Sequence, residues 1–359
     1  MLADLEAQLS SVAARVCDSY WLVSWATKWN NCIPGVGYGN CHLRTLVLIP
    51  CTERKRRKPS EELRARSLAP GTAKELASEW LKRVSNATSR YSHEEVYCGR
   101  AYREAANAAK ELSAELAVIS AGLGVVRAGQ RIPSYSLTVA PGSEDTILYK
   151  IKSDRASPDA WWSALKFGLD EGAGVQDVLR SESSALILIA LSANYARLIR
   201  DELADLSAGE TQRIRIFGAG ITGHLPPSLA DAVMPYDVRL NGPDSTIPGT
   251  MSDFGSRALH HFAKCLRDGV VSAVNAGDDR QRLLEIMEAW RTPNNQPRER
   301  MTDKEVVNFI LEHWEDTRGR SGVSLRLLRD SGHACEQSRF RDLFREASSI
   351  RIEVGQSAA

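Results

Sequence analysis

The chain has 359 residues, 43% of them hydrophobic and 25% charged, which is ordinary for a globular protein and leaves room for two or three domains. Its net charge of +1 excludes an argument for nucleic-acid binding from overall charge, so such an argument must rest on local clusters. The sequence contains no apolar run long enough to span a membrane, no signal-peptide pattern at its start, and seven scattered cysteines without a C-x-x-C pair. We therefore expect a cytoplasmic protein without a membrane partner.

Residues 1–44 predict a helical, tryptophan-rich extension. Three tryptophans spaced four apart would line one face of a helix, where they either pack into a core or offer a surface for stacking bases. A glycine-rich loop follows and contains Cys32 and Cys41, with His42 next to it. Their spacing matches no zinc pattern, so we expect neither a metal nor a cofactor.

Four short apolar runs predict buried strands, at residues 46–50, 117–119, 185–191 and 213–217. Helical patterns lie between them at 72–84, 102–112 and 192–203, and another follows at 255–269. Alternation of buried strands with helices favours a parallel sheet with crossover helices. We predict one α/β domain over residues 45–285, with a short edge strand at 233–240.

The segment after the second strand is where the sequence most strongly indicates a site. Ser120, Gly122 and Gly124 end that strand, and Tyr135 follows in a polar loop. Glycines let a ligand approach the main chain, although a simple turn explains them equally well. In an α/β sheet, ligands bind outside the carboxyl ends of the strands.

Polar residues also follow two neighbouring strands. Cys51 comes directly after the first strand, and Ser192 and Tyr195 come after the third. We predict that they bind substrate together with the Ser120 segment. Ser192 also suits the cap of the helix that follows it.

A run of five cations occupies positions 54–58, immediately after the first strand, and Arg131 lies farther along. A solvated charge run is the ordinary explanation, but its position at a strand end favours contact with phosphates. We predict DNA contacts from these six residues: Arg54, Lys55, Arg56, Arg57, Lys58 and Arg131.

Residues 301–350 follow a polar linker and predict a separate helical unit. Two short helices joined by a turn at Gly332 resemble a helix-turn-helix, with Arg339 and Arg341 on the last helix. Arginines there can contact base edges and phosphates. A small packing domain without a ligand is the alternative.

Three segments together resemble the YaaA-like domain. They are LVLIPC followed by charged residues, YCGRAYREA, and ISAGLGVVRAGQRIPSYSLT. The family motifs are similar: a strand followed by Cys-Ser/Thr-x-x-Lys, then Tyr-x-Gly-x-x-Phe/Tyr, then Ser-Ala-x-x-Gly running on to Ile-x-Pro-Tyr. The resemblance covers residues 45–255 and departs from the motif at Ser134, which separates the proline from the tyrosine.

The resemblance implies a uracil-DNA-glycosylase-like (Rossmann-like) fold, because the YaaA-like domain is similar to those enzymes and to a domain attached to archaeosine transglycosylases. Bacterial anti-phage DNA glycosylases look like part of the same group. The expected function is therefore a DNA glycosylase that excises a modified base, in anti-phage defence. A non-catalytic DNA-binding stress protein and a transglycosylase-like base-modification enzyme are the alternatives.

Base excision passes through a positively charged sugar, which requires a carboxylate to stabilise it or to orient water. The Gly-Gln-Asp-Pro-Tyr motif of uracil glycosylases is absent, so the resemblance supplies no catalytic acid. We choose Asp253 ahead of Glu53, with Asn194 as the group that contacts the base edge. Asp253 equally suits the cap of the helix that begins beside it.

Overall fold

The computed structural model describes residues 44–357, apart from 154–155, 170–171, 183–184 and 294–298, and describes side chains as far as residue 351. The predicted extension at 1–44, with Cys32, Cys41 and His42, therefore lies almost wholly outside the described residues. The central sheet has five strands in the order β4-β3-β1-β6-β7. Their bounds are β1 Thr45–Pro50, β3 Glu115–Ser120, β4 Gly124–Val126, β6 Leu186–Ala190 and β7 Ile214–Phe217.

Strands β1, β3, β6 and β7 are mutually parallel, which confirms the four predicted strands and the α/β class. Leu48 in the central strand pairs with Ala117 on one side and Ile189 on the other. All three are fully buried, as expected for strands that helices cover on both faces. The sheet is not wholly parallel, however, because β4 turns back antiparallel to β3.

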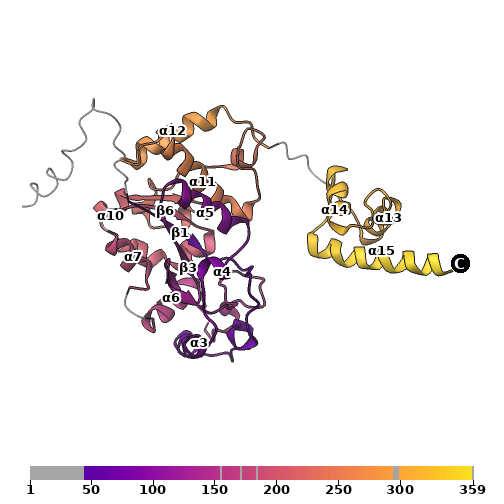
Figure 1. Cartoon of the computed structure of the whole chain (residues 1–359), viewed down its shortest axis with the longest axis horizontal. Coiled ribbons are helices and arrows are strands. Elements are labelled where there is room, and N and C mark those ends of the chain that lie inside the picture. The colour runs from indigo at the N-terminus through magenta and orange to yellow at the C-terminus, as the bar shows by residue number, and fades with distance from the viewer. Residues whose placement is uncertain (1–43, 154–155, 170–171, 183–184, 294–298, 358–359) are drawn as a thin grey trace, which may run out of the picture. The chain divides into compact units, whose positions relative to one another are not determined.

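Helices cover both faces of this sheet (Figure 1). Helices α5 (Arg100–Glu111) and α11 (Phe254–Arg267) pack against each other, α5 contacting β1 and β3, and α11 contacting β6 and β7. Right-handed crossovers place the helices before β6 and those between β6 and β7 on the opposite face. These are α6 Pro158–Phe167, α7 Val175–Ser181, α8 Ala193–Leu198, α9 Arg200–Ala204 and α10 Ala208–Gln212.

The remaining helices of the α/β domain are α3 (Ala73–Asn86), α4 (His93–Val96) and α12 (Ala276–Glu288). Short 3-10 turns complete it: η1 Glu61–Leu63, η2 Ala65–Ser67, η3 Ile147–Lys150, η4 Thr222–His224, η5 Pro227–Leu229, η6 Val238–Asn241 and η7 Met251–Asp253. A small separate ladder joins β2 (Tyr91–Ser92) to β5 (Arg131–Ile132).

Two predicted elements differ from the structure. The segment 233–240 makes only one bridge to β7, at Val233, and then winds into a 3-10 turn, because Asp237 accepts a hydrogen bond from the amide of Arg239. The helix expected over 192–203 is two helices, α8 and α9, that meet at Ile199.

Residues 299–357, which we call the C-terminal domain, have a hydrophobic core of their own. Helices α13 (Asp303–Glu312), α14 (Ser321–Asp330) and α15 (Gln337–Ser357) enclose it. The predicted turn at Gly332 carries β9 (His333–Ala334), which pairs in parallel with β8 (Glu299–Arg300). The helix-turn-helix order is thus present with an added strand pair and a longer last helix. Within the part of the chain that the structure describes, no helix could cross a membrane.

Candidate functional site

The chain reverses its direction across the sheet between β1 and β6. After β1 it proceeds to β3 on one side, and after β6 it proceeds to β7 on the other, with the crossover helices on opposite faces. A crevice outside the carboxyl ends of two such strands is where ligands bind in open α/β sheets. Cys51 leaves β1 there and Tyr195 follows β6, and the Cys51 Sγ lies 2.9 Å from the Tyr195 hydroxyl.

A hydrogen-bonded cluster of tyrosines continues from this contact. The hydroxyl of Tyr135 shares hydrogen bonds with the Tyr97 hydroxyl at 2.8 Å and with Ser120 Oγ at 2.5 Å. The Tyr97 and Tyr135 rings meet edge to face, with centroids 6.4 Å apart. Polar groups from three strand ends and from the loop before α5 therefore meet in one place.

Lys55 covers this cluster. Its Nζ lies 4.8 Å from the centroid of the Tyr135 ring and 5.2 Å from that of Tyr97, within the range of cation–π attraction. The same amine donates a hydrogen bond to the carbonyl of Thr52. We call the following six residues the aromatic site: Cys51, Lys55, Tyr97, Ser120, Tyr135 and Tyr195.

Burial sets the protonation of this site. It raises the pKa of Tyr97, Tyr135 and Tyr195 well above that of an ordinary phenol, so all three hydroxyls keep their protons and can donate hydrogen bonds. Burial also lowers the pKa of the Lys55 amine, and the neighbouring Cys51, Glu53 and Cys98 only partly oppose the effect. The site therefore combines neutral phenols with an amine that loses its proton more readily than a surface lysine.

Two buried tryptophans hold the loop after β3. Trp80 of α3 donates its indole N–H to the carbonyl of Gly122 at 2.7 Å, and Trp161 of α6 donates to that of Ala121 at 2.7 Å. A side chain at Gly122 would press on the Trp80 and Tyr135 rings at 3.1–3.2 Å. Gly122 therefore fits the loop closely against the aromatic site, and its carbonyl is already bonded.

Several predicted substrate-binding residues have other roles. Gly124 has a φ of +73°, and a side chain there would strike the Ala173 carbonyl at 2.7 Å, so it serves the turn into β4. Ser192 is exposed at the N-cap of α8, without a side-chain capping bond. Asn194 accepts a hydrogen bond from Arg197 at 3.2 Å. Arg131 extends β5 and donates to the carbonyl of Arg90.

The predicted cation run divides into two parts. Lys55 turns inward, whereas the other four residues are exposed at the same sheet edge. We call these four the cationic run: Arg54, Arg56, Arg57 and Lys58. Glu53 precedes them, is exposed, and accepts a hydrogen bond from Ser143 Oγ at 3.0 Å.

Asp253 also reaches the carboxyl edge of the sheet, because α11 begins over β6 and β7. Gly255 permits this approach: a side chain there would meet the carbonyl of Phe217 at 2.8 Å. The Asp253 carboxylate, however, is already engaged. Its Oδ1 accepts from Arg257 Nε at 2.6 Å and from the amide of Thr250 at 2.9 Å.

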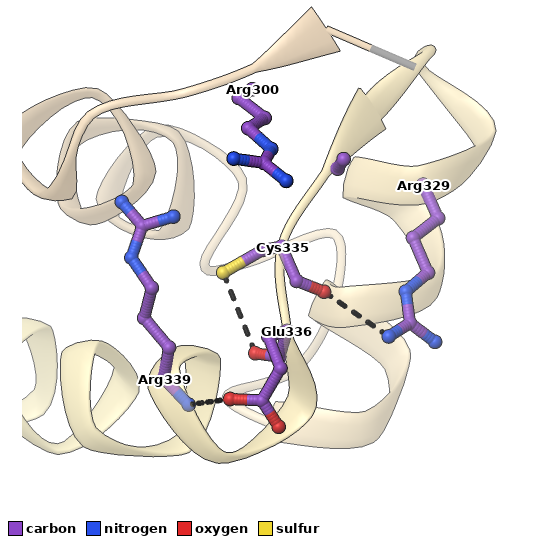
Figure 2. Close-up of a pocket in the computed structure, with 6 residues that line it drawn as sticks. Arg300, Arg329, Cys335, Glu336 and Arg339 are labelled. Atoms are coloured by element: carbon purple, nitrogen blue, oxygen red, sulfur yellow. Dashed lines mark hydrogen bonds between the residues drawn. The ribbon is translucent and has the colours of Figure 1, made fainter. Parts of the chain in front are cut away.

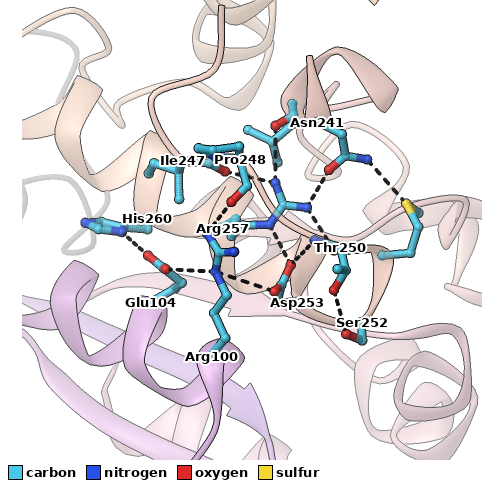
Figure 3. A network of polar contacts seen from close by, with 12 residues as sticks. Arg100, Glu104, Asn241, Ile247, Pro248, Thr250, Ser252, Asp253, Arg257 and His260 are labelled. Atoms are coloured by element: carbon cyan, nitrogen blue, oxygen red, sulfur yellow. Dashed lines mark hydrogen bonds and ion pairs between the residues drawn. The ribbon is translucent and has the colours of Figure 1, made fainter. Parts of the chain in front are cut away.

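Figure 3 shows the wider network around Asp253. Its second oxygen lies 3.6 Å from Nε of Arg100, which also pairs with Glu104 at 3.3 Å, and Glu104 in turn contacts His260 Nδ1 at 2.9 Å. The Arg257 side chain is fully buried. This arrangement joins α5, α11 and the loop before α11, which gives Asp253 a structural role that the sequence did not separate from a catalytic one.

The C-terminal domain contains an arginine-lined cavity of about 410 Å³. In Figure 2 the side chains of Arg300 and Arg339 flank the space around Cys335. Arg339, a predicted DNA contact, pairs with Asp303 at 2.7 Å and donates to the carbonyl of Met301. Arg341 is exposed on α15. The cavity suits an anion, and Arg341 is the predicted contact that faces solvent.

Sequence reasoning missed Tyr97, Trp80 and Trp161 as parts of the site and assigned Lys55 to phosphates. The segment around Tyr97 and the lysine four residues after Cys51 both lie in the motifs quoted above, which was the available indication. In comparisons with family models, with curated proteins and with solved structures, none matches the chain.

Proposed function

We propose that this protein is a DNA glycosylase that removes a modified base, with the aromatic site as its base-binding centre. The observation that carries the proposal is the contact between Cys51 and Tyr195 at the point where the chain reverses across the sheet. Hydroxyl, thiol and aromatic groups converge there. An extruded base is recognised by such groups, through stacking and hydrogen bonds to its edge.

Entry of a base would require Lys55 to move. Its amine now covers the Tyr97 and Tyr135 rings, and a cation–π contact of this kind contributes only about 0.5–2 kcal/mol. Stacking of a base on an aromatic ring contributes about 1–3 kcal/mol, which is enough to displace the amine. The displaced amine would remain beside the sugar of the extruded nucleotide.

Phosphate contacts in this proposal come from the cationic run, which leaves the same strand as Cys51. Four exposed cations beside a base-binding site would hold the backbone on either side of the extruded nucleotide. The C-terminal domain, with an arginine-lined cavity and the exposed Arg341, supplies a second DNA-binding surface.

Glu53 becomes the preferred carboxylate in this proposal. It lies two residues beyond Cys51 and has one side-chain partner, Ser143, whereas Asp253 is held by Arg257 and Thr250. A carboxylate with a weak neutral partner can turn toward a developing positive charge. One inside a buried ion pair is held in place, because leaving it would strand the buried arginine.

The test is incubation of the protein with DNAs that carry different modified bases, followed by mass spectrometry of released bases and alkaline cleavage of the strand. Tyr135→Phe should lower base release at least tenfold, because it removes the hydroxyl that links Tyr97 to Ser120. Tyr236→Phe is the matched control: it removes a buried hydroxyl bonded to His261 at 2.8 Å, outside the aromatic site.

A non-catalytic DNA-binding protein is the second candidate, and the engagement of Asp253 favours it. The same experiment separates the two. DNA binding without release of any base from any of the substrates supports the second candidate, and release that Tyr135→Phe leaves unchanged removes the aromatic site from the proposal.

A further inference from the structure

Lys55 differs from the four cations that surround it in sequence. Its main chain forms an antiparallel bridge with Tyr97, which fixes the loop and turns the side chain toward the aromatic site. The residue is half-buried, and its amine lies over two tyrosine rings. A lysine that only held a phosphate would extend toward solvent as its neighbours do, so this placement suits a different role.

The surroundings of the amine favour a nucleophile. Burial among aromatic rings destabilises the ammonium form, and the direction of the resulting pKa shift leaves more neutral amine at a given pH than a surface lysine has. Lysines that form Schiff bases with carbonyl compounds are activated by such desolvation. Cys51 and the phenols of Tyr135 and Tyr195 lie around it, and the phenols retain protons to donate.

We propose that Lys55 forms a Schiff base with the aldehyde of an abasic deoxyribose and that the protein cleaves the DNA strand at that position. The proposal rests on the proposed function in one respect, since base excision produces the abasic sugar. The substrate class is DNA that contains an open-chain C1′ aldehyde, whichever base was removed. Lys55 then follows the excision step as the nucleophile of a second step in the same site.

The reaction needs no reagent other than water. The amine lone pair forms the Nζ–C1′ bond, and the carbonyl oxygen leaves as water to give an iminium ion. The C2′ proton then passes to water, a C2′=C3′ double bond forms, and the C3′–O bond breaks with its electron pair remaining on the departing phosphate. Hydrolysis of the imine restores the Lys55 amine and frees the unsaturated aldehyde on the other strand fragment.

The experiment uses the full-length protein and an oligonucleotide with a preformed abasic site, treated with sodium borohydride to reduce any imine. We expect a covalent adduct on a denaturing gel, with peptide mass spectrometry locating the attachment at Lys55. Without borohydride, the strand should be cut by elimination. Lys55→Met and Lys55→Arg should each lower adduct yield at least 100-fold, and Lys55→Arg keeps a cation over the rings.

Lys74→Met is the matched control and should trap as much adduct as the wild type. The Lys74 amine also lies over an aromatic ring, that of Phe167, at 5.2 Å, but on the exposed surface of α3. No adduct with the wild type, or attachment at another residue, would overturn the proposal. Because the abasic site is preformed, a wild-type protein that traps DNA but releases no base contradicts only the proposed function, and one that releases base without trapping contradicts only this inference.

Discussion

Replacing Asp253 with asparagine should destabilise the α/β domain more than it impairs chemistry. The buried Arg257 side chain has five hydrogen-bond partners, and Asp253 supplies the only charge among them. The four neutral acceptors are the carbonyls of Leu240, Ile247 and Thr250 and the side-chain oxygen of Asn241. Asp253→Asn therefore leaves a buried guanidinium without a counterion.

Breaking a buried ion pair costs about 3–5 kcal/mol. The lower end applies, because the asparagine oxygen can still accept from Arg257 Nε and four neutral acceptors remain. For a domain of this size, about 3 kcal/mol corresponds to a fall of about 6–12 °C in the melting temperature. The capping bond to Thr250 contributes little to the loss, since asparagine caps about as well as aspartate.

The assay is thermal unfolding followed by circular dichroism, together with single-turnover base release measured well below the midpoint of the variant. Glu285→Gln is the control, because it breaks an exposed pair with Arg282 and should change stability by less than about 1 kcal/mol. Base release by Asp253→Asn should remain within tenfold of the wild type. An unchanged melting temperature with abolished release would refute the structural role and restore Asp253 as the catalytic carboxylate.

Three further predictions concern DNA contact and pH. Changing Arg54, Arg56 and Arg57 to glutamine should weaken DNA binding and flatten its salt dependence by about 0.9 per lost phosphate contact, and equal anisotropy titrations at every salt concentration would contradict this. Deleting 299–357 should lower DNA affinity while circular dichroism shows an intact α/β domain, and an isolated segment that binds no DNA at low salt would exclude the helix-turn-helix interpretation. Burial lowers the pKa of His261 from 6.5 to about 4, so the unfolded chain binds the extra proton first and stability is lost as pH falls below 6.5. The loss between pH 7 and pH 5 should be about 2 kcal/mol, and urea midpoints of His261→Gln that decline as steeply as those of the wild type would rule this out.

Local sequence was sufficient for the elements that depend on neighbours in the chain. The continuous apolar runs predicted β1, β3, β6 and β7 because strands buried on both faces must be apolar throughout. Helices α3 and α13 begin where their threonines predict, each with a capping box that uses a glutamate three residues later. Element β4 was missed, since three residues of hairpin carry too little pattern to separate them from a turn.

The tertiary structure decided what the site residues do. Cys51 and Tyr195 are 144 residues apart and meet only because β1 and β6 become neighbours in the sheet, which no local pattern specifies. Lys55 looks like one of five equivalent cations in the sequence, but its bridge to Tyr97 turns it inward. Asp253 suits catalysis and capping equally until Arg257 is placed beside it. Side-chain roles of this kind depend on burial and on partners distant in sequence, so they follow from strand order and packing, whereas strands and helices follow from hydrophobic pattern and capping.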